Sequence, residues 1–456
     1  MFRIRVSIRF MLLSVTGLCI RATGRGVPFL LVAVVMTGSY AHCQETGSDL
    51  DVLLQQRRYI ELQPTLAKWR SQFQPSDLAY FDAVLANRTN QVETSAQLLE
   101  SLLPALSKNK SARTEIALCT LADDYAKSFR YQQASNTYAE AARLTEEQEK
   151  ESFCDAERES SRWRLLGGVA AQTVSGARSF TVVGKRDTLG LVQLPVTARN
   201  YTGSWIADTG ASLSVISRSA ANRMGLDTST IADTAEGIAL VVPVHTAVIR
   251  EIRIGKAVLR NVAVLVVEDS DLTFPAIGYH IEGSLGLPVL IALGRVTFYP
   301  GAQLRFDREK HSEGNADYHN LFFEGSALLA SADFGKGDQL FGLDTGALLT
   351  VLSAQFYRDS KGPLGGGAWV ALELAGAGGT LVSPAYIVRN TLVNLGGGCA
   401  RVQNIPVLLE STGRAGEFYG NIGQSVLKSF SSVTLDFVAM RFTVSGGNVN
   451  ACRLGD

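Results

Sequence analysis

The chain has 456 residues, with 43 Lys and Arg against 43 Asp and Glu, and 46% of its residues are hydrophobic. This length allows two to four domains with sizeable cores. The zero formal net charge argues against a nucleic-acid-binding protein, which would carry a basic surface, and the hydrophobic content excludes a wholly disordered chain. None of the 43 glycines lies in residues 48–166, whereas most of them follow residue 167. We therefore expect two differently built parts.

The N-terminal segment has the pattern of an export signal. An apolar run at 27–36 follows two arginines and leads into small residues that end at Ala41. This pattern predicts a signal peptide over residues 1–41 and an exported protein, either periplasmic or secreted. An uncleaved signal-anchor is the alternative, because no charged residue occurs from 26 to 44. In that case the N-terminal segment anchors the protein to a membrane.

Export changes how the cysteines are interpreted, because disulfides form in oxidising compartments. Four cysteines follow residue 43, one pair in each of two regions. We expect Cys119 to pair with Cys154, and Cys399 with Cys452. Four buried thiols are the alternative. No Cys-x-x-Cys motif occurs and the 5 histidines are dispersed, so the sequence predicts neither a metal site nor another cofactor.

Residues 48–166 carry Ala, Leu, Gln, Glu and Arg without glycine, a composition that favours consecutive helices. Apolar residues recur at helical spacing, for example over 79–85, and two further helices are expected at 114–130 and 132–144. The stretch 125–141 resembles a tetratricopeptide repeat, with small residues where paired helices meet. The resemblance implies a groove for a protein partner or a peptide. A helical bundle that only packs on its neighbour is the alternative.

From residue 179 onward, short β-branched runs alternate with glycines and polar turns, as at 180–183, 262–267 and 437–444. Many short strands at close spacing predict an all-β barrel or sandwich. The charged and polar stretch 307–317 divides this part and is expected to be a linker.

Two motifs repeat within the β part. Asp-Thr-Gly occurs at 208–210 and again at 344–346, each time after an apolar run and before an alanine. A polar–aliphatic–glycine element follows at 284–286 and at 421–423. The separations between the copies are 136 or 137 residues throughout, which indicates an internal duplication.

These residues resemble the aspartic protease family, whose members place two Asp-Thr/Ser-Gly loops face to face, one from each of two similar lobes. The alanine after each glycine resembles the retropepsin branch, and the single chain with two lobes resembles pepsin, so the chain looks like a fused, single-chain retropepsin-like protease. The glycine-free composition and the repeat-like stretch predict an N-terminal all-α, repeat-like domain at 48–166. An all-β bilobal acid-protease barrel fold would follow, with lobes at 172–308 and 318–448.

By this resemblance, Asp208 and Asp344 are the catalytic residues. Two carboxylates held about 3 Å apart cannot both ionise, so they share one proton. One then acts as general base on a water, and the other donates its proton to the scissile carbonyl. The resemblance also implies residues that support the catalytic loops, namely Thr209, Gly210, Thr345 and Gly346, and glycines in the bracing elements, namely Gly286 and Gly423.

Members of this family cover the substrate with a β-hairpin flap. Residues 375–380 form a glycine-rich tip between two apolar runs, which predicts such a flap in the second lobe with Gly376, Gly378 and Gly379 at its tip. The first lobe offers 234–237, a weaker candidate whose neighbourhood lacks an aromatic side chain. A surface hairpin without contact to substrate is the alternative.

The sequence thus predicts an exported aspartic endopeptidase that acts on peptide or protein substrates without a cofactor, with a helical domain that recruits a partner or substrate. The alternative is a catalytically silent, protease-like protein that binds peptides or acts as a scaffold. Retention of both aspartates favours the enzyme, because a binding module has no need for two like charges in a cleft. No nucleic-acid partner is expected, and membrane contact is expected only if the signal is uncleaved.

Overall fold

The computed structural model describes residues 49–148, 153–230, 233–236, 241–309, 319–359, 367–410 and 418–447. The expected signal at 1–41, most of the expected linker at 307–317, and Cys452 lie outside these ranges. Within them, no helix is long and apolar enough to cross a membrane.

The expected helical region is confirmed. After a helical stretch at 49–55, the helices are α2 (Tyr59–Trp69), α3 (Pro75–Arg88), α4 (Val92–Lys108), α5 (Thr114–Lys127), α6 (Tyr131–Glu147) and α7 (Ala156–Leu165). Consecutive helices from α3 to α7 pack on one another, and α5 and α6 are the two helices expected at 114–130 and 132–144. Apolar side chains such as Leu99 and Ala122 are buried between them.

One of the two expected disulfides is confirmed. Cys119 of α5 is bonded to Cys154, which precedes α7, with 5.9 Å between the Cα atoms. Cys399 is also disulfide-bonded. Its expected partner, Cys452, lies outside the described residues, so the pairing of Cys399 with Cys452 stays a prediction.

Residues 173–307, called the first half here, form a nine-stranded sheet with the order β1-β9-β6-β12-β5-β4-β8-β7, and β3 pairs with β4. Its strands are β1 (Thr173–Gly176), β3 (Lys185–Arg186), β4 (Val192–Ala198), β5 (Tyr201–Ala207), β6 (Ser214–Ser217), β7 (Asp233–Glu236), β8 (Val241–Ile254), β9 (Ala257–Val267) and β12 (Gly283–Leu285). Two short helices, α8 (Arg218–Met224) and α9 (Leu287–Ala292), follow β6 and β12. The small pair β10 (Thr273–Phe274) and β11 (Tyr279–His280) lies apart from this sheet.

Residues 320–445, called the second half, form an eight-stranded sheet with the order β15-β16-β17-β22-β18-β21-β20-β19. Its strands are β15 (Leu321–Glu324), β16 (Ala327–Asp333), β17 (Gln339–Leu343), β18 (Val351–Leu352), β19 (Gly367–Gly376), β20 (Gly379–Leu395), β21 (Gly398–Leu408) and β22 (Gly420–Ile422). The helices α10 (Ala354–Asp359) and α11 (Gln424–Leu427) follow β18 and β22. The order of elements therefore repeats that of the first half.

A third sheet joins the two halves. Its order is β2-β14-β13-β23-β24, with β2 (Ser179–Val183), β13 (Arg295–Phe298) and β14 (Gln303–Asp307) from the first half and β23 (Ser432–Asp436) and β24 (Arg441–Ser445) from the second. In the central antiparallel pair, Thr297 lies opposite Thr434, and their hydroxyl oxygens are 3.0 Å apart. Because these threonines are duplicated positions, the local arrangement is that of a two-fold axis between the halves.

The prediction of a strand at 437–444 is wrong for residues 437–440. Residues 437–440 form a turn, and β24 begins only at Arg441. The carboxylate of Asp436 accepts hydrogen bonds from the N–H groups of Val438 and Ala439, at 3.0 and 2.9 Å. A short acidic side chain that caps its own backbone in this way favours a turn over a continued strand.

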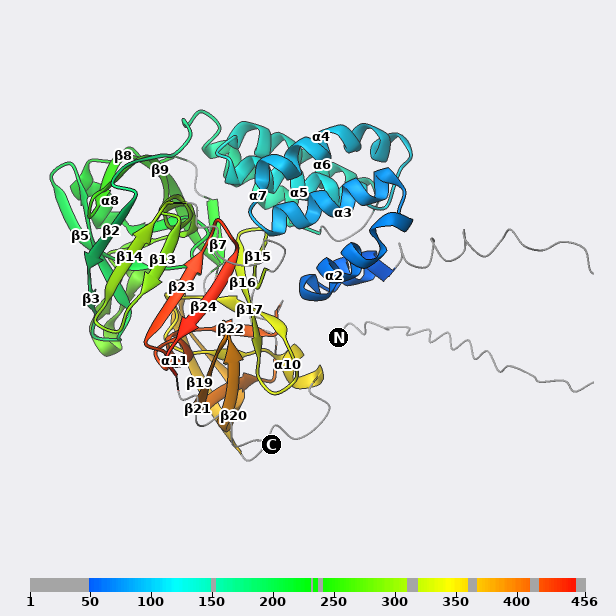
Figure 1. Ribbon diagram of the computed structural model, residues 1–456. Helices are drawn as coiled ribbons and strands as arrows, with labels where there is room; N and C mark the ends of the chain where they lie inside the picture. The colour runs from blue at the N-terminus through cyan, green and yellow to red at the C-terminus, as the bar shows by residue number, and fades with distance from the viewer. Residues whose placement is uncertain are drawn as a thin grey trace, which may run out of the picture.

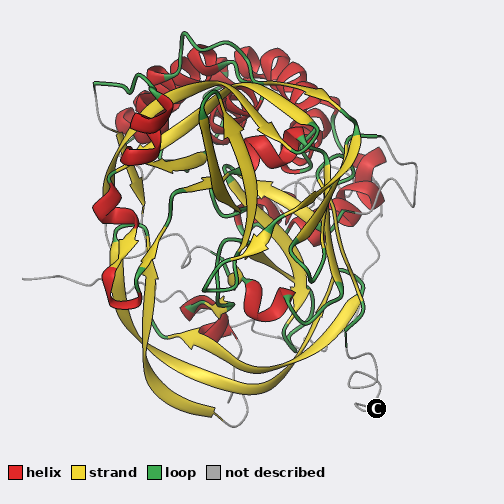
Figure 2. Ribbon diagram, turned by 90° about the vertical axis from the view of Figure 1, so that its left-hand side faces the viewer, coloured by secondary structure: helices red, strands yellow, loops and turns green. Residues whose placement is uncertain are grey.

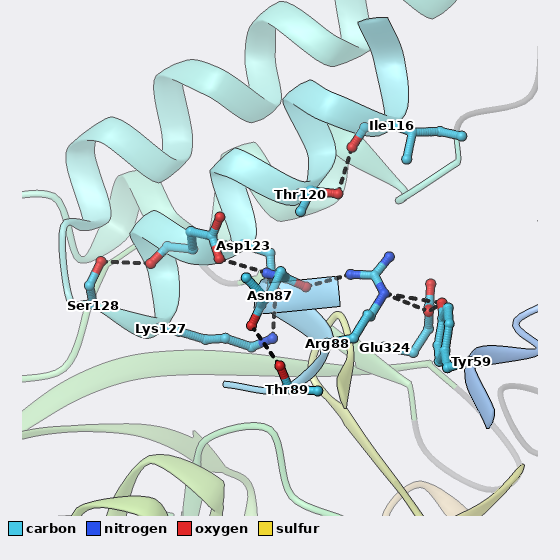
Figure 3. Close-up of polar contacts among 12 residues, drawn as sticks. Tyr59, Asn87, Arg88, Thr89, Ile116, Thr120, Asp123, Lys127, Ser128 and Glu324 are labelled. Carbon is cyan, nitrogen blue, oxygen red and sulfur yellow. Dashed lines mark hydrogen bonds and ion pairs between the residues drawn. The ribbon is translucent and has the colours of Figure 1, made fainter. Parts of the chain in front are cut away.

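The helical region lies along one side of the β part (Figures 1 and 2). One apolar cluster of buried side chains contains residues of the helices together with Leu213 and Leu265 of the first half and Phe322 and Leu329 of the second. A buried polar contact accompanies it, because Arg88 of α3 lies 3.2 Å from Glu324 at the end of β15, where Tyr59 also binds (Figure 3). The helical region thus packs on both halves.

Candidate active site

The two Asp-Thr-Gly loops occupy equivalent places in the two halves, directly after β5 and after β17. The N–H of Asp208 donates to the carbonyl of Leu285 at 3.1 Å, and the N–H of Asp344 donates to the carbonyl of Ile422 at 3.0 Å. Each carbonyl belongs to the polar–aliphatic–glycine element of the same half. These elements therefore brace the loops.

The glycines of the bracing elements lie in close contact with the chain after each Asp-Thr-Gly loop. The N–H of Gly286 donates to the hydroxyl of Ser214 at 3.0 Å, and that of Gly423 donates to the hydroxyl of Thr350 at 2.9 Å. A Cβ atom at either glycine would lie 2.5 Å from backbone atoms of that segment, closer than carbon atoms can pack. Only glycine fits at these two positions.

The two loops are tied to each other through their threonines. The N–H of Thr209 donates to the hydroxyl of Thr345 at 3.1 Å, and the N–H of Thr345 donates to the hydroxyl of Thr209 at 3.0 Å. Each hydroxyl then donates across to the other half, to the carbonyls of Leu343 at 2.6 Å and Ala207 at 2.7 Å. Both threonines are buried. This reciprocal set of bonds holds the loops face to face.

The carboxyl groups of Asp208 and Asp344 are brought together by this arrangement. Each accepts a hydrogen bond from the glycine N–H of its own loop, Gly210 at 2.9 Å and Gly346 at 2.8 Å. A Cβ atom on Gly210 would lie 2.5 Å from the Asp344 carboxyl, and one on Gly346 would lie 2.5 Å from that of Asp208. The loop glycines therefore leave the space in which the two carboxyls meet, and both aspartates keep some exposure.

The surroundings raise the pKa of both carboxyls. For Asp208, burial is the main cause, followed by the negative charge of Asp344. For Asp344, burial also raises the pKa, but hydrogen bonds from Asn421, from the Gly346 N–H and from Asp208 work in the opposite direction. The pair therefore shares one proton over a range of pH.

Sequence reasoning missed two residues beside the carboxyls. The side-chain amide of Asn421 donates to Oδ2 of Asp344 at 3.2 Å, and the hydroxyl of Ser284 hydrogen-bonds to Asp208. Both residues are the polar first position of the bracing element. Their repeat position was visible in the sequence, and it could have indicated that they face the dyad.

The expected flap of the second half is a hairpin. Strands β19 and β20 pair in register up to Gly376 opposite Gly379, and Gly378 lies in the turn with a φ of +83°, which favours glycine. The N–H of Gly378 reaches the carbonyl of Asp271 in the first half at 3.4 Å. In the first half, the candidate at 234–237 belongs to the hairpin of β7 with β8, although residue 237 lies outside the described residues. Contact with substrate stays a prediction for both.

A cavity of about 480 Å³ lies between the halves beside the second loop. Leu189 and Val192 line it from the first half, and Leu348 and Leu349 from the second. The lining also includes the charged residues Arg186 and Lys428. In the part of the chain that the structure describes, no group of three or more His, Cys, Asp or Glu could hold a metal ion.

Comparison with known proteins relates part of the chain to a protein family. Residues 194–289 match the aspartyl protease family. The match contains Asp208 and the bracing element 284–286, and it ends before the second half. A search of the curated proteins gave no match. Among solved structures, the crystal structure of a retropepsin-like aspartic protease from Rickettsia conorii is similar over 30% of this chain and 92% of its own, with 17% identity and a TM-score of 0.21.

Proposed function

We propose that the protein is an aspartic endopeptidase whose catalytic dyad is Asp208 and Asp344. The observation that carries this proposal is the meeting of the two carboxyls, each against the loop glycine of the other half, within a reciprocal set of threonine hydrogen bonds. The aspartyl protease match over residues 194–289 supports it. In this proposal, the segments 172–308 and 318–448 are the two lobes of one enzyme.

The dyad would hydrolyse a peptide bond without a covalent intermediate. An ionised carboxylate takes a proton from a water molecule while the water oxygen bonds to the carbonyl carbon. The protonated carboxyl gives its proton to the carbonyl oxygen, so a neutral tetrahedral diol forms. The carboxyl that took the water proton then gives it to the nitrogen as the carbon–nitrogen bond breaks, while a diol hydroxyl gives its proton to the other carboxylate. This yields an acid and an amine and returns the one shared proton to its starting carboxyl.

The remaining parts of the molecule are assigned by the same proposal. The hairpin of β19 and β20 serves as a flap over the peptide, with Gly376, Gly378 and Gly379 allowing its tip to bend. The cavity beside Leu348 receives an apolar side chain of the substrate. The helical region recruits a substrate or partner protein through a repeat-like groove, and the protein acts after export, in the periplasm or outside the cell.

The experiment is to incubate the purified protein with a denatured protein substrate between pH 3 and 7 and to identify the cleavage products by mass spectrometry. The wild type is expected to cleave internal peptide bonds. Asp208→Asn is expected to abolish cleavage while peptide binding, followed by fluorescence polarisation, is retained. Binding by the wild type without turnover at any pH would instead favour the silent, peptide-binding alternative.

A further inference from the structure

The two halves differ at one pair of facing residues next to the dyad. In the first half, Ser284 of β12 lies opposite Ile206 of β5. In the second half, Asn421 of β22 lies opposite Gly342 of β17. Ser284 and Asn421 are duplicated positions, and so are Ile206 and Gly342. Each half therefore pairs a large side chain with a small one. The large one is Ile206 on β5 in the first half, and Asn421 on β22 in the second half.

Gly342 makes the position of the Asn421 side chain possible. A Cβ atom on Gly342 would lie 2.7 Å from Oδ1 of Asn421, closer than the two atoms can pack. Since Oδ1 faces Gly342, the amide nitrogen faces Asp344 and donates to it. In the first half, the equivalent strand position holds the buried Ile206, opposite the shorter Ser284.

Most other contacts of the two carboxyls are matched between the halves. The loop glycines donate to them at 2.9 and 2.8 Å, and the bracing carbonyls bind the two aspartate N–H groups at 3.1 and 3.0 Å. Ser284 and Asn421 hold the same repeat position, but a hydroxyl reaches Asp208 where an amide reaches Asp344, and a backbone contact from Ala347 also favours the charged form of Asp344. The pair of Asn421 and Gly342 is thus the side-chain difference beside the dyad. An amide N–H that donates to a carboxyl stabilises its charged form.

We propose that Asn421, seated by Gly342, makes Asp344 the ionised member of the dyad and the general base, and leaves the proton on Asp208. This inference rests on the proposed function. Asp344 then takes the proton from water, and Asp208 gives its proton to the scissile carbonyl. Asn421 is a positioning residue, because it touches Asp344 and acts on the reaction only through that carboxyl.

The test is the pH dependence of kcat/KM for the wild type, Asn421→Ser and Ser284→Ala. The acid limb of the profile reports ionisation of Asp344, and the basic limb reports loss of the proton from Asp208. Asn421→Ser is expected to move the acid limb up by about one pH unit, a roughly tenfold loss on the acid side, and to leave the basic limb in place. Ser284→Ala, the matched control, is expected to move only the basic limb upward.

A second set of variants tests whether Gly342 and Asn421 act as one unit. Gly342→Ala is expected to push the amide away and to shift the acid limb as Asn421→Ser does, although the added methyl group would contact Asn421 and not Asp344. Combining the two substitutions is expected to add nothing further. The double substitution G342I/N421S introduces the residue pair of the first half, Ile206 and Ser284. The new isoleucine fills the space left by the asparagine, and we expect the acid limb to shift as it does in Asn421→Ser.

Three results would overturn the inference. In the first, Asn421→Ser leaves the acid limb of the pH profile unmoved, and in the second it shifts the basic limb instead. In the third, the shifts caused by Gly342→Ala and Asn421→Ser add in the double variant. A readout without turnover separates this failure from failure of the proposed function. Carbon-13 NMR of the aspartate carboxyls in the whole protein is expected to show the lower dyad pKa rising in Asn421→Ser. An inactive wild type would refute the enzyme, and an unmoved titration would refute the role of Asn421.

Discussion

Among the described residues, burial raises the pKa of carboxyl groups at two places. At the dyad, the burial of Asp208 is reinforced by the charge of Asp344. In the helical region, burial raises the pKa of Asp124 to about 7, although the hydrogen bond from Asn87 partly opposes it. Asn87 donates at 2.8 Å both to Asp124 and to its neighbour Asp123, and Figure 3 shows the contact with Asp123. A raised pKa marks a functional site only where the group is also reachable by substrate.

Asp124 makes the free energy of unfolding depend on pH. Its folded pKa lies above its unfolded value, so between about pH 4 and 7 the folded state binds more protons than the unfolded state, and stability falls as the pH rises. Asp124→Asn removes this titration. We expect the free energy of unfolding of the variant minus that of the wild type to be larger at pH 8 than at pH 4.5, by about 2–4 kcal/mol. Urea unfolding at the two pH values measures this. Equal pH dependence in both proteins would contradict it.

At the scale of elements, helix α7 is fixed to strand β7 by a buried ion pair. The guanidinium of Arg162 donates to the carboxylate of Asp233 at 2.9 Å and to the carbonyl of Thr234 at 3.0 Å, and it also pairs with Glu159 at 2.8 Å. Strand β7 is half of the first-half hairpin, so the helical region holds one side of the candidate flap. The hairpin of β19 and β20 in the second half contacts the first half instead. At its tip, the N–H of Gly378 reaches the carbonyl of Asp271.

Arg162→Met removes this link and leaves two buried carboxylates without their partner. We expect a loss of about 3–5 kcal/mol in the free energy of unfolding, since breaking one side of a buried ion pair strands the other charge. The matched control is Arg164→Met on the same helix, because Arg164 is exposed. Urea denaturation compares the two. Similar, small losses for both variants would show that the ion pair does not hold the helix to the hairpin.

The elements that repeat could be predicted from the sequence, and the contacts between unrelated segments could not. The two Asp-Thr-Gly loops, their bracing glycines and the hairpin at 375–380 each have a local signature or a second copy. The pairing of Arg162 with Asp233 joins residues 71 positions apart that share no pattern. The apolar residues at 437–440 predict a strand, but the carboxylate of Asp436 caps the following backbone and a turn forms there instead.

At the scale of the whole molecule, the duplication explains how one chain forms a site that needs two loops. The shared sheet brings Thr297 opposite Thr434, and the loops meet through Thr209 and Thr345. The seating of the helical region against both halves could not be predicted, because composition indicates helices but not the surface on which they pack. The asymmetry at Asn421 was visible as a departure from the repeat, yet its meaning required the facing residue Gly342.

The central claim is that Asp208 and Asp344 act as one catalytic unit, and the most direct test is a double-mutant cycle. We would measure kcat/KM for the wild type, Asp208→Asn, Asp344→Asn and the double variant on one denatured substrate at one pH, with circular dichroism to confirm the fold. Each single variant is expected to fall to the level of the double variant, because neither carboxyl alone can both activate water and protonate the carbonyl. Activity of either single variant well above that of the double variant would contradict the account.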